Sequence, residues 1–414
     1  MLGVALPFVF VDVRENYGMG EECMRKEQKL NMMFDSLADG LNITKTMLEK
    51  AEKAYNALGE HIKAANEQWD VIIYPQGSFQ LGTVIKPVND EEQYDVDLVV
   101  LVKTPYYDAE TLRNEVIKIL KSHGRYEGKI ENKKPCIRIQ YADSAQFHMD
   151  IASAQDIELS KDTSINIARF DGDENYFYEI SNPKGYIEWF KKTMQYEKLQ
   201  KSQSMLYEQC QTEVEELELS KMRTPLQKAI QILKRHRDIF FANRENADDR
   251  PSSIIITTLC AMAYEDTRGT FEKDNIYLTI VNMLEKFPAY VKKNSEGYYY
   301  LENPSNPKEN FLKKWCDNPK LVVAFEQWIS KARADIIYNP ETFIEDNPQE
   351  LRKSLYESFG QRDADIALDN YGKQIGKYAQ NGELKYDMAS ANVVLNEDEG
   401  KSYNKHTYFG GMCE

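Results

Sequence analysis

The feature that most constrains the fold is a short stretch, residues 94–98, in which apolar residues alternate with two aspartates. In a β-strand, residues two apart project from the same face. Asp95 and Asp97 therefore share one face, while Val96 and Leu98 enter a core. Two neighbouring carboxylates repel each other unless a cation lies between them. The stretch predicts a strand that is buried on one side and carries a pair of metal-binding acids on the other.

Two further motifs strengthen this prediction because each fits the same site. Gly77-Ser78 follows an apolar run, residues 71–74, and a turn of this kind lets the backbone approach a phosphate closely. Asp150 has apolar neighbours on both sides, and a buried carboxylate is costly to leave unpaired. Each motif alone is common in turns and at strand ends. Together they predict that Asp150 shares a metal with the paired acids, and all-oxygen ligands favour Mg²⁺.

The composition limits the classes of function. A chain of 414 residues is long enough for two domains, because single cores rarely grow beyond about 250–300 residues. Its formal net charge of -15 argues against a large non-specific DNA-binding surface. The 6 cysteines include no C-x-x-C pair and the 5 histidines no H-x-x-x-H pair, so we expect neither a disulfide framework nor a zinc site. We therefore expect a cytoplasmic protein with reduced thiols.

The two ends of the chain carry little information. Residues 1–13 are apolar, but they lack a basic start and a cleavage site, and they are too short for a bilayer, which needs about 20 apolar residues. A buried strand and an upstream extension of the true start are the two interpretations of this segment. Residues 387–414 are polar and weakly patterned. No other segment approaches a membrane span, so we expect no membrane partner.

The spacing of apolar residues divides the chain into a mixed α/β half, residues 1–182, and a mainly helical half, residues 183–414. In the first half we expect helices at 27–37, 44–62 and 109–123, and strands at 71–74, 94–102, 135–141 and 146–151. Residues 151–182 are rich in Asp, Asn and Ser, and we expect an irregular connection over the active face. In the second half we expect helices that begin at Thr224-Pro225 and Pro251-Ser252-Ser253, and others at 275–287, 321–337 and 348–359.

The three motifs together resemble the signature of the polymerase-β-like nucleotidyltransferase superfamily. That signature is a Gly-Gly or Gly-Ser turn, then two acids separated by one apolar residue, then a third acid between apolar residues. The matching segments are Gln76-Gly77-Ser78, Asp95-Val96-Asp97-Leu98 and Met149-Asp150-Ile151. Gln76 is polar where the signature is apolar. The spacing between the turn and the first acid, residues 79–94, is longer than usual, and we interpret it as a longer hairpin through Lys86-Pro87.

Within this superfamily, residues 67–360 resemble the cGAS/DncV-like nucleotidyltransferases, or CD-NTases. These are bacterial anti-phage enzymes of the CBASS type that make cyclic di- or trinucleotides and are related to oligoadenylate synthases. The resemblance implies an α+β fold in two domains. A polymerase-β-like nucleotidyltransferase domain would contain a mixed sheet with bracing helices. A helical C-terminal domain of the oligoadenylate-synthase type would follow, with the active site in the cleft between them.

The resemblance also implies the residues of the site and their ligands. The catalytic and metal-binding residues would be Asp95, Asp97 and Asp150. The residues that bind the donor triphosphate would be Gln76, Gly77, Ser78, Lys234, Ser252 and Ser253. A helix N-terminus, as at residues 252–253, is independently a favourable anion site. The cofactor would be two Mg²⁺ ions, with Mn²⁺ as the alternative. The substrates would be ATP, GTP or pyrimidine NTPs, and the product would act on a signalling effector.

Two groups of residues have alternative interpretations. The basic run at 234–237 is either a solvated helix face or, through Lys234, a wall of the triphosphate site. His148 shares a strand face with Asp150, so it lies either in the site or elsewhere as a structural histidine, and we favour the structural interpretation.

The sequence also leaves open other functions and several kinds of activator. The chain could add nucleotides to RNA ends, as CCA-adding and poly(A) enzymes do, although an acidic chain argues against RNA binding. It could also be a non-catalytic nucleotide-binding module, although the intact acidic motifs argue against this. The acidic composition likewise makes a long-DNA activator unexpected. A regulatory protein partner, a small ligand and constitutive activity are the remaining options.

Overall fold

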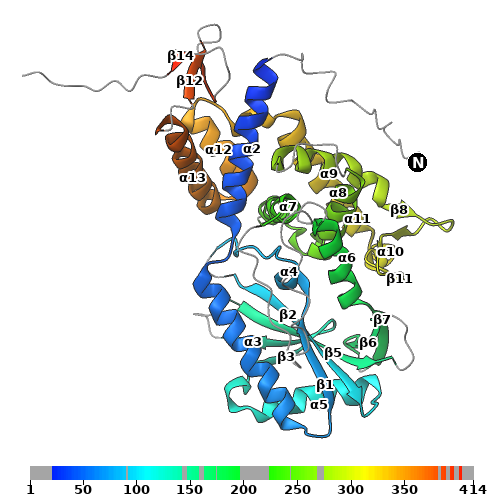
Figure 1. Cartoon of the computed structure of the whole chain (residues 1–414). Coiled ribbons are helices and arrows are strands. Elements are labelled where there is room, and N and C mark those ends of the chain that lie inside the picture. Colours follow the sequence, from blue (N-terminus) through cyan, green and yellow to red (C-terminus); the bar gives the residue numbers. More distant parts are fainter. Residues whose placement is uncertain are drawn as a thin grey trace, which may run out of the picture.

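The structure is a computed structural model that describes residues 21–89, 92–141, 147–157, 163–173, 175–195, 223–242, 244–267, 275–380, 384–387, 392–395 and 401–402. Figure 1 shows a half that contains a large sheet and, above it, a half made mainly of helices. Residues 1–13, with their two interpretations, and most of residues 387–414 lie outside the described residues. Within the described residues, no helix is long and apolar enough to cross a membrane.

The sheet-containing half consists of seven strands with helices packed against them. Its helices are α3 (Lys45–Ala65), α4 (Gly77–Gln80) and α5 (Ala109–Ser122), followed by a 3-10 turn, η1 (Gly124–Tyr126). Its strands are β1 (Asp70–Pro75), β2 (Tyr94–Thr104), β3 (Ile130–Asn132), β4 (Ile137–Gln140), β5 (Phe147–Asp156), β6 (Ile165–Phe170) and β7 (Tyr176–Ser181). The helices and strands predicted up to residue 150 are confirmed, with ends that shift by a few residues.

The order of the strands places the two acid-bearing strands side by side. The path β1-β2-β5-β4-β3 is hydrogen-bonded in that order, and β6 joins β5 to β7. β2 runs antiparallel to β1 and parallel to β5, and β4 runs antiparallel to β5. Because β1 and β2 are antiparallel neighbours, the long spacing between Ser78 and Asp95 is the connection of a hairpin, as predicted.

One face of the sheet is buried beneath α3 and α5. The core on this face contains Val96, Leu98, Met149 and Ile151 from β2 and β5, together with Tyr55, Leu58 and Ile62 from α3 and Leu112 and Val116 from α5. The strand residues in this core alternate with the acids, so the acids project from the opposite face. α3 begins where the Thr44 side chain accepts a hydrogen bond from the Met47 amide, which confirms the predicted N-cap.

The prediction of an irregular connection at residues 151–182 is wrong. β5 continues to Asp156, and β6 and β7 form an antiparallel hairpin that widens the sheet. Within β7, Ser181 alone is buried, and Phe177 and Ile180 are exposed. The strands carry Asn, Arg, Glu and Ser because much of the hairpin faces solvent. A solvated hairpin has the composition of a loop, which is why the sequence misled here.

The helical half is built from nine helices within the described residues. They are α2 (Glu21–Leu41), α6 (Pro183–Gln195), α7 (Pro225–Phe241), α8 (Ser253–Asp266), α9 (Ile276–Tyr290), α10 (Lys313–Asp317), α11 (Pro319–Arg333), α12 (Pro348–Phe359) and α13 (Gln361–Gln380). Short strands accompany them: β8 (Lys292–Lys293), β9 (Tyr299–Tyr300), β10 (Glu302–Asn303), β11 (Asn306–Asn310), β12 (Leu384–Asp387), β13 (Asn392–Leu395) and β14 (Lys401–Ser402). The helix starts predicted at Thr224-Pro225 and near Ser252 are confirmed.

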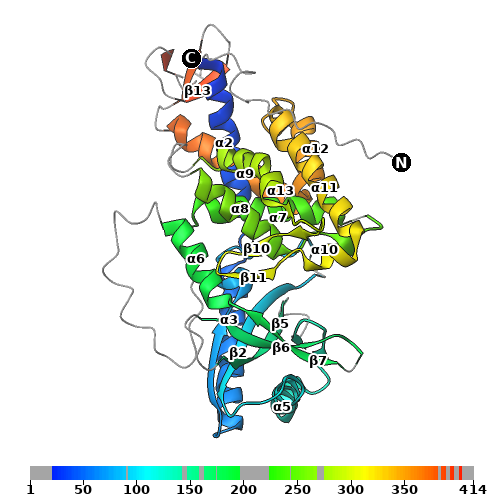
Figure 2. The same cartoon turned by 90° about the vertical axis from the view of Figure 1, so that its right-hand side faces the viewer.

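α2 packs in the helical half, although the sequence assigned it to the catalytic half at residues 1–182. Met33, Phe34 and Leu37 are fully buried in a core that also contains Leu233 of α7 and Ile280 of α9. α2 also packs along α13, and Figures 1 and 2 both show it rising among the helices. The described part of the chain therefore passes from the helical half into the sheet-containing half through α3 and returns through α6. The predicted domain boundary near residue 183 stays a proposal. It lies at the start of α6, where the chain returns to the helical half.

α7 holds the segment that connects the turn after β1 to the acid-bearing strand β2. Gln227 Nε2 donates to the Leu81 carbonyl at 2.9 Å, and Gln231 Nε2 donates to the Val84 carbonyl at 2.7 Å. Two cationic side chains continue this row. Their bonds are Lys234 Nζ to the Thr83 carbonyl at 3.0 Å and Arg235 Nη2 to the Lys86 carbonyl at 2.6 Å. These donors recur about one or two turns apart on one face of α7, so α7 supplies hydrogen bonds that the segment cannot obtain from a sheet.

Replacement of Gln231 by alanine should lower the free energy of unfolding by about 1–3 kcal/mol, because the buried Val84 carbonyl would lose its donor. Urea unfolding followed by tryptophan fluorescence measures this change. Gln327→Ala is the matched control, because Gln327 is an exposed glutamine inside α11 and its loss should cost less than about 0.5 kcal/mol. Equal effects of the two substitutions would contradict a stabilising role for the bond to Val84.

Candidate active site

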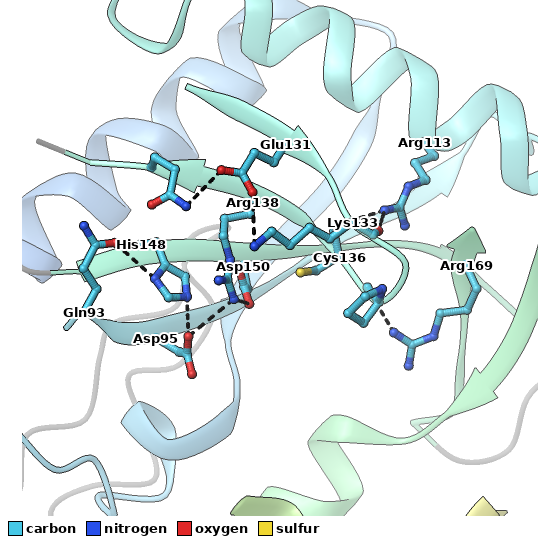
Figure 3. Close-up of polar contacts among 12 residues, drawn as sticks. Gln93, Asp95, Arg113, Glu131, Lys133, Cys136, Arg138, His148, Asp150 and Arg169 are labelled. Atoms are coloured by element: carbon cyan, nitrogen blue, oxygen red, sulfur yellow. Dashed lines mark hydrogen bonds and ion pairs between the residues drawn. The ribbon is translucent and has the colours of Figure 1, made fainter. Parts of the chain in front are cut away.

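The acids singled out in the sequence lie together on the open face of the sheet. Asp95 and Asp97 alternate along β2, and Asp97 is the register partner of Asp150 on β5. His148 is the register partner of Asp95, and Arg138 of β4 is that of Asp150. We call these five residues the acid face. Figure 3 shows Asp95, Arg138, His148 and Asp150 directed toward one another from three neighbouring strands.

Arg138 and His148 each pair with one of the three acids. Arg138 donates from Nε and Nη2 to the two Asp150 carboxylate oxygens at 2.7 and 2.6 Å, and its Nη2 also lies 3.6 Å from Asp95 Oδ1. Such forked pairs fix the orientation of a carboxylate as well as its charge. His148 Nε2 meets Asp95 Oδ1. His148 therefore lies in the site, which is the interpretation that the sequence did not favour.

The acids respond differently to this environment. Burial raises the pKa of Asp97 well above its ordinary value, and the negative charges of Asp95 and Asp150 raise it further. Burial also acts to raise the pKa of Asp95, but the hydrogen bond and charge of His148, with the charge of Arg138, outweigh it and lower that pKa. Of these two acids, Asp97 is thus the one whose charged form is disfavoured, whereas the charged form of Asp95 is favoured.

Gly77 brings the turn after β1 directly against this face. It begins α4 with a φ of 64°, and a Cβ atom at this position would overlap the Asp97 carboxylate. The backbone amide of Gln76 also donates to the Asp97 carbonyl at 2.9 Å. Glycine is required here for two reasons, the left-handed backbone and the close approach. The predicted proximity of the turn and the paired acids is confirmed.

The basic run on α7 is buried, so its interpretation as a solvated helix face is wrong. Arg235 is fully buried and pairs with Asp363 at 2.9 Å, and His236 lies 3.1 Å from Asp335. Lys234 is 5% exposed and lies close enough to Asp95 and Asp97 to interact with their charges. Burial lowers the pKa of Lys234 to about 8, and the charge of Arg237 acts in the same direction. Lys234 is the cation of the helical half that faces the acids.

The two serines at the start of α8 are placed differently from Lys234. Ser252 is the exposed N-cap residue, and its side chain makes no capping hydrogen bond. Ser253 Oγ accepts a hydrogen bond from Arg237 Nη1 at 3.1 Å. Within the described residues, no hydrogen bond joins either serine to the acid face. Their assignment to the triphosphate therefore stays a prediction, and Arg237 is the side chain through which Ser253 is oriented.

Three residues of the site escaped the sequence interpretation. Arg138 was passed over because its neighbours Ile137 and Ile139 identified only a strand, although their alternation places Arg138 on the opposite face from the core. Gln93 Oε1 lies 3.3 Å from His148 Nδ1 and stands just before the strand. Cys136 is buried beside Asp150, and burial together with that charge raises the pKa of its thiol to about 12. No sequence pattern pointed to Cys136, because an isolated cysteine is more typical of a core residue.

The donor set fits a divalent cation. Asp95, His148 and Asp150 each offer one ligand atom, and these three atoms lie within 4.8 Å of one another. A cation with bond lengths of about 2.1 Å brings ligand atoms to within about 4.2 Å, so small movements would complete the site. A cation bound there would also relieve the repulsion from Asp95 and Asp150 that helps to raise the pKa of Asp97.

Comparisons with known proteins agree on one family. The family model for "Cyclic GMP-AMP synthase DncV-like, nucleotidyltransferase domain" matches residues 72–153, which include the turn and all three acids. A c-di-GMP synthase of Roseivirga ehrenbergii is 30% identical over 299 residues, 71% of this chain and 75% of that protein. The cyclic dinucleotide synthase CdnG of Bradyrhizobium diazoefficiens is 20% identical over 388 residues, 88% of each protein.

Solved structures show the same fold. The CdnG structure of Bradyrhizobium diazoefficiens in complex with GTP has a TM-score of 0.63 at 18% identity, and covers 83% of this chain and 99% of its own. The Vibrio cholerae DncV structure with the linear intermediate 5' pppA(3',5')pG has a TM-score of 0.52 at 17% identity, and covers 86% and 94%. The mixed sheet, its acid face and the adjoining helices define a nucleotidyltransferase. The chain belongs to the cGAS/DncV-like nucleotidyltransferases, the CD-NTases, as its motifs predicted.

Gly77→Ala should reduce pyrophosphate release from nucleotides by about 100-fold or more, because the added methyl group displaces Asp97. Gly128→Ala is the matched control: Gly128 has a φ of 70°, but a Cβ there would meet nothing within 4 Å. Both variants should lose about 1–2 kcal/mol of stability through the left-handed backbone. Turnover measured beside thermal unfolding separates the two effects, and equal turnover by the two variants would contradict the close approach to Asp97.

Asp97→Asn should stabilise the metal-free protein at neutral pH. The folded-state pKa of Asp97 is raised above that of the unfolded chain, so the folded state loses stability as pH rises through the window between them. Asparagine has no such loss. In EDTA at pH 7–8 we expect Tm to rise on the order of 2–4 °C, the shift that ~1 kcal/mol produces.

Thermal unfolding of the two proteins from pH 4 to pH 8 measures this effect. The difference between Asp97→Asn and the parent protein should vanish near pH 4, close to the ordinary pKa of aspartate. Asp95→Asn is the control with the opposite sign, because the pKa of Asp95 is lowered and its charge contributes to stability at neutral pH. A Tm gain for Asp95→Asn and none for Asp97→Asn would contradict a raised pKa for Asp97 and a lowered pKa for Asp95.

Proposed function

We propose that this protein joins two nucleoside triphosphates into a cyclic dinucleotide and releases pyrophosphate at each of two transfers. The observation that carries the proposal is the acid face, where Asp97 and Asp150 lie in register on adjacent strands. The names of the relatives support the cyclic product, since one is a c-di-GMP synthase and another a cyclic dinucleotide synthase. The first of these relatives shares 30% identity over most of both chains.

Asp95, Asp97 and Asp150 would hold two Mg²⁺ ions, with Mn²⁺ as the alternative. When bound, such ions neutralise the charge on the attacking and leaving oxygens of an in-line displacement. The protein's own contribution is to position these carboxylates. Arg138 fixes Asp150 through its forked pair, and β2 fixes the spacing of Asp95 and Asp97. Preorganised charge of this kind supplies most of the acceleration in phosphoryl-transfer chemistry.

Each transfer would proceed as follows. The hydroxyl oxygen of the acceptor ribose bonds to the α-phosphorus of the donor, and the bond from that phosphorus to the bridging oxygen breaks. Pyrophosphate leaves with the electron pair. Asp150 would take the hydroxyl proton and pass it to water. In the second transfer the free hydroxyl and the triphosphate belong to one linear intermediate, so the same step closes the ring.

The donor triphosphate would lie between the two halves of the molecule. Gly77 and Ser78, with the preceding Gln76, would bind it from the sheet side. Lys234 supports this placement from the helical side, because it is buried beside the acids and carries positive charge below a pH of about 8. Ser252 and Ser253 would bind the outer phosphates at the start of α8, as the family resemblance implies.

The substrates proposed first are GTP and ATP. A related structure contains GTP, and another contains a linear intermediate made from A and G nucleotides. The c-di-GMP synthase relative favours GTP as both donor and acceptor. We further propose that the product is a bacterial anti-phage signal that acts on an effector, with a regulatory protein as the partner that controls synthesis.

The purified full chain should be incubated with each NTP alone and with all four, in the presence of Mg²⁺ or Mn²⁺, and then treated with phosphatase. We expect pyrophosphate release and a phosphatase-resistant product whose mass, by mass spectrometry, equals that of a cyclic dinucleotide. Asp95→Asn combined with Asp97→Asn should abolish both signals without unfolding the protein. Asp317→Asn combined with Asp346→Asn removes two exposed acids and should leave both unchanged.

The same assay separates the alternative functions. Label that is incorporated only when RNA is added would indicate RNA-end addition of the CCA-adding or poly(A) type. Binding of NTPs without turnover would indicate a non-catalytic module. Either result would reject cyclic dinucleotide synthesis, and full activity of the Asp95/Asp97 variant would reject the assignment of the metal ligands.

A further inference from the structure

His148 is an unusual member of the acid face because it is a buried imidazole among carboxylates. It stands two residues before Asp150 on β5 and is the register partner of Asp95 on β2. The side chain is 9% exposed, in contrast to that of Asp95 opposite it, which is 56% exposed. A buried polar ring needs partners for both nitrogens. The partners of the two ring nitrogens therefore indicate the role of His148.

The two ring nitrogens have different surroundings. Nδ1 lies 3.3 Å from the amide oxygen of Gln93, and an amide oxygen accepts hydrogen bonds, so Nδ1 carries a proton. Nε2 is buried and lies against the Asp95 carboxylate oxygen Oδ1. A nitrogen and a carboxylate oxygen that face each other are held together either by a proton on the nitrogen or by a cation bound to both atoms.

This arrangement is the one that metal-binding histidines adopt. Such residues bind the cation through one nitrogen and donate the other N–H to an outer partner, which fixes the tautomer and the ring orientation. Here the outer partner is Gln93. Arg138 serves Asp150 in the same way, and a carboxylate has about four lone-pair positions, so the forked pair leaves Asp150 able to bind a cation. The three ligand atoms of Asp95, His148 and Asp150 lie within 4.8 Å of one another.

We propose that His148 is a nitrogen ligand of the cation bound between Asp95 and Asp150, oriented by Gln93, and that it tunes the site toward transition-metal cations. The inference rests on the proposed function, because it concerns the same metal site. Mg²⁺ is a hard cation that prefers oxygen ligands. Imidazole adds affinity along the first-row transition series, so a mixed nitrogen and oxygen site binds Mn²⁺ or Co²⁺ more tightly relative to Mg²⁺ than an all-carboxylate site does.

The direct test is electron spin-echo envelope modulation on the full chain, stripped with EDTA and loaded with Mn²⁺ in the absence of nucleotide. We expect the ¹⁴N coupling of a bound imidazole in the parent protein and its loss in His148→Gln. His123→Gln, which alters a histidine outside the acid face, is the matched control and should retain the coupling. Mn²⁺ bound without ¹⁴N coupling in the parent protein would overturn the proposal, and this result needs no variant to fold.

Calorimetric titration with Mn²⁺ and Mg²⁺ supplies a second measurement. His148→Gln should weaken Mn²⁺ binding by about 10-fold or more and Mg²⁺ binding by less than about 3-fold, and Gln93→Leu should weaken Mn²⁺ binding by about 10-fold. Equal losses for both cations would indicate that His148 serves Asp95 only as a charged partner, and would overturn the proposal.

Pyrophosphate release from NTPs by the same samples keeps this inference apart from the proposed function. Nitrogen coupling without turnover supports ligation by His148 and rejects the nucleotidyl transfer. Turnover without nitrogen coupling rejects ligation by His148 and leaves the proposed transfer in place.

Discussion

The arrangement of the site depends on how α7 satisfies the backbone of the segment between α4 and β2. The described part of this segment lies outside the sheet, and side chains of α7 donate hydrogen bonds to its carbonyl groups at Leu81, Thr83, Val84, Lys86 and Pro87. Because the bonds to Leu81 and Val84 are buried, separation of the two halves would expose unsatisfied groups on both sides. The same helix carries Lys234, and the same segment follows Gly77. The interaction that joins the halves therefore also sets the distances between the turn after β1, the acids and Lys234, the cation that faces them.

The acid face shows how a fold can hold three carboxylates together before any substrate arrives. Asp150 is paired with Arg138 and Asp95 with His148, and the pKa of Asp97 is raised because burial and its two acidic neighbours oppose its charge. In each case a different effect reduces the repulsion between the carboxylates. A bound cation would relieve the repulsion that remains between the three carboxylates. The fold keeps these carboxylates close in the free protein, and this would favour binding of a cation.

The sequence predicted those features that depend on alternation within one strand or on a local cap. The shared face of Asp95 and Asp97, the buried acid Asp150 and the start of α3 at Thr44 all follow from residues a few positions apart. Features that depend on distant pairing were not predictable in the same way. The basic run on α7 looked like a solvated face because its partners, Asp335 and Asp363, lie about 100 residues further along the chain. Arg138 was missed for the same reason, since only strand register places it opposite Asp150.

Burial along the acid face also fixes the direction from which substrates approach. Beyond the acids, the same strands continue with Val99, Leu101, Ala152 and Ala154, which are buried in an apolar core with Ile165 and Ile167. This part of the face is closed. The Asp150 side chain is 14% exposed, whereas that of Asp95 is 56% exposed, so the opening lies at the N-terminal end of β2. In the proposed transfer, an acceptor hydroxyl that entered there would meet Asp95 before it reached Asp150. The more buried Asp150, which Arg138 holds in place, would therefore be suited to receive the hydroxyl proton.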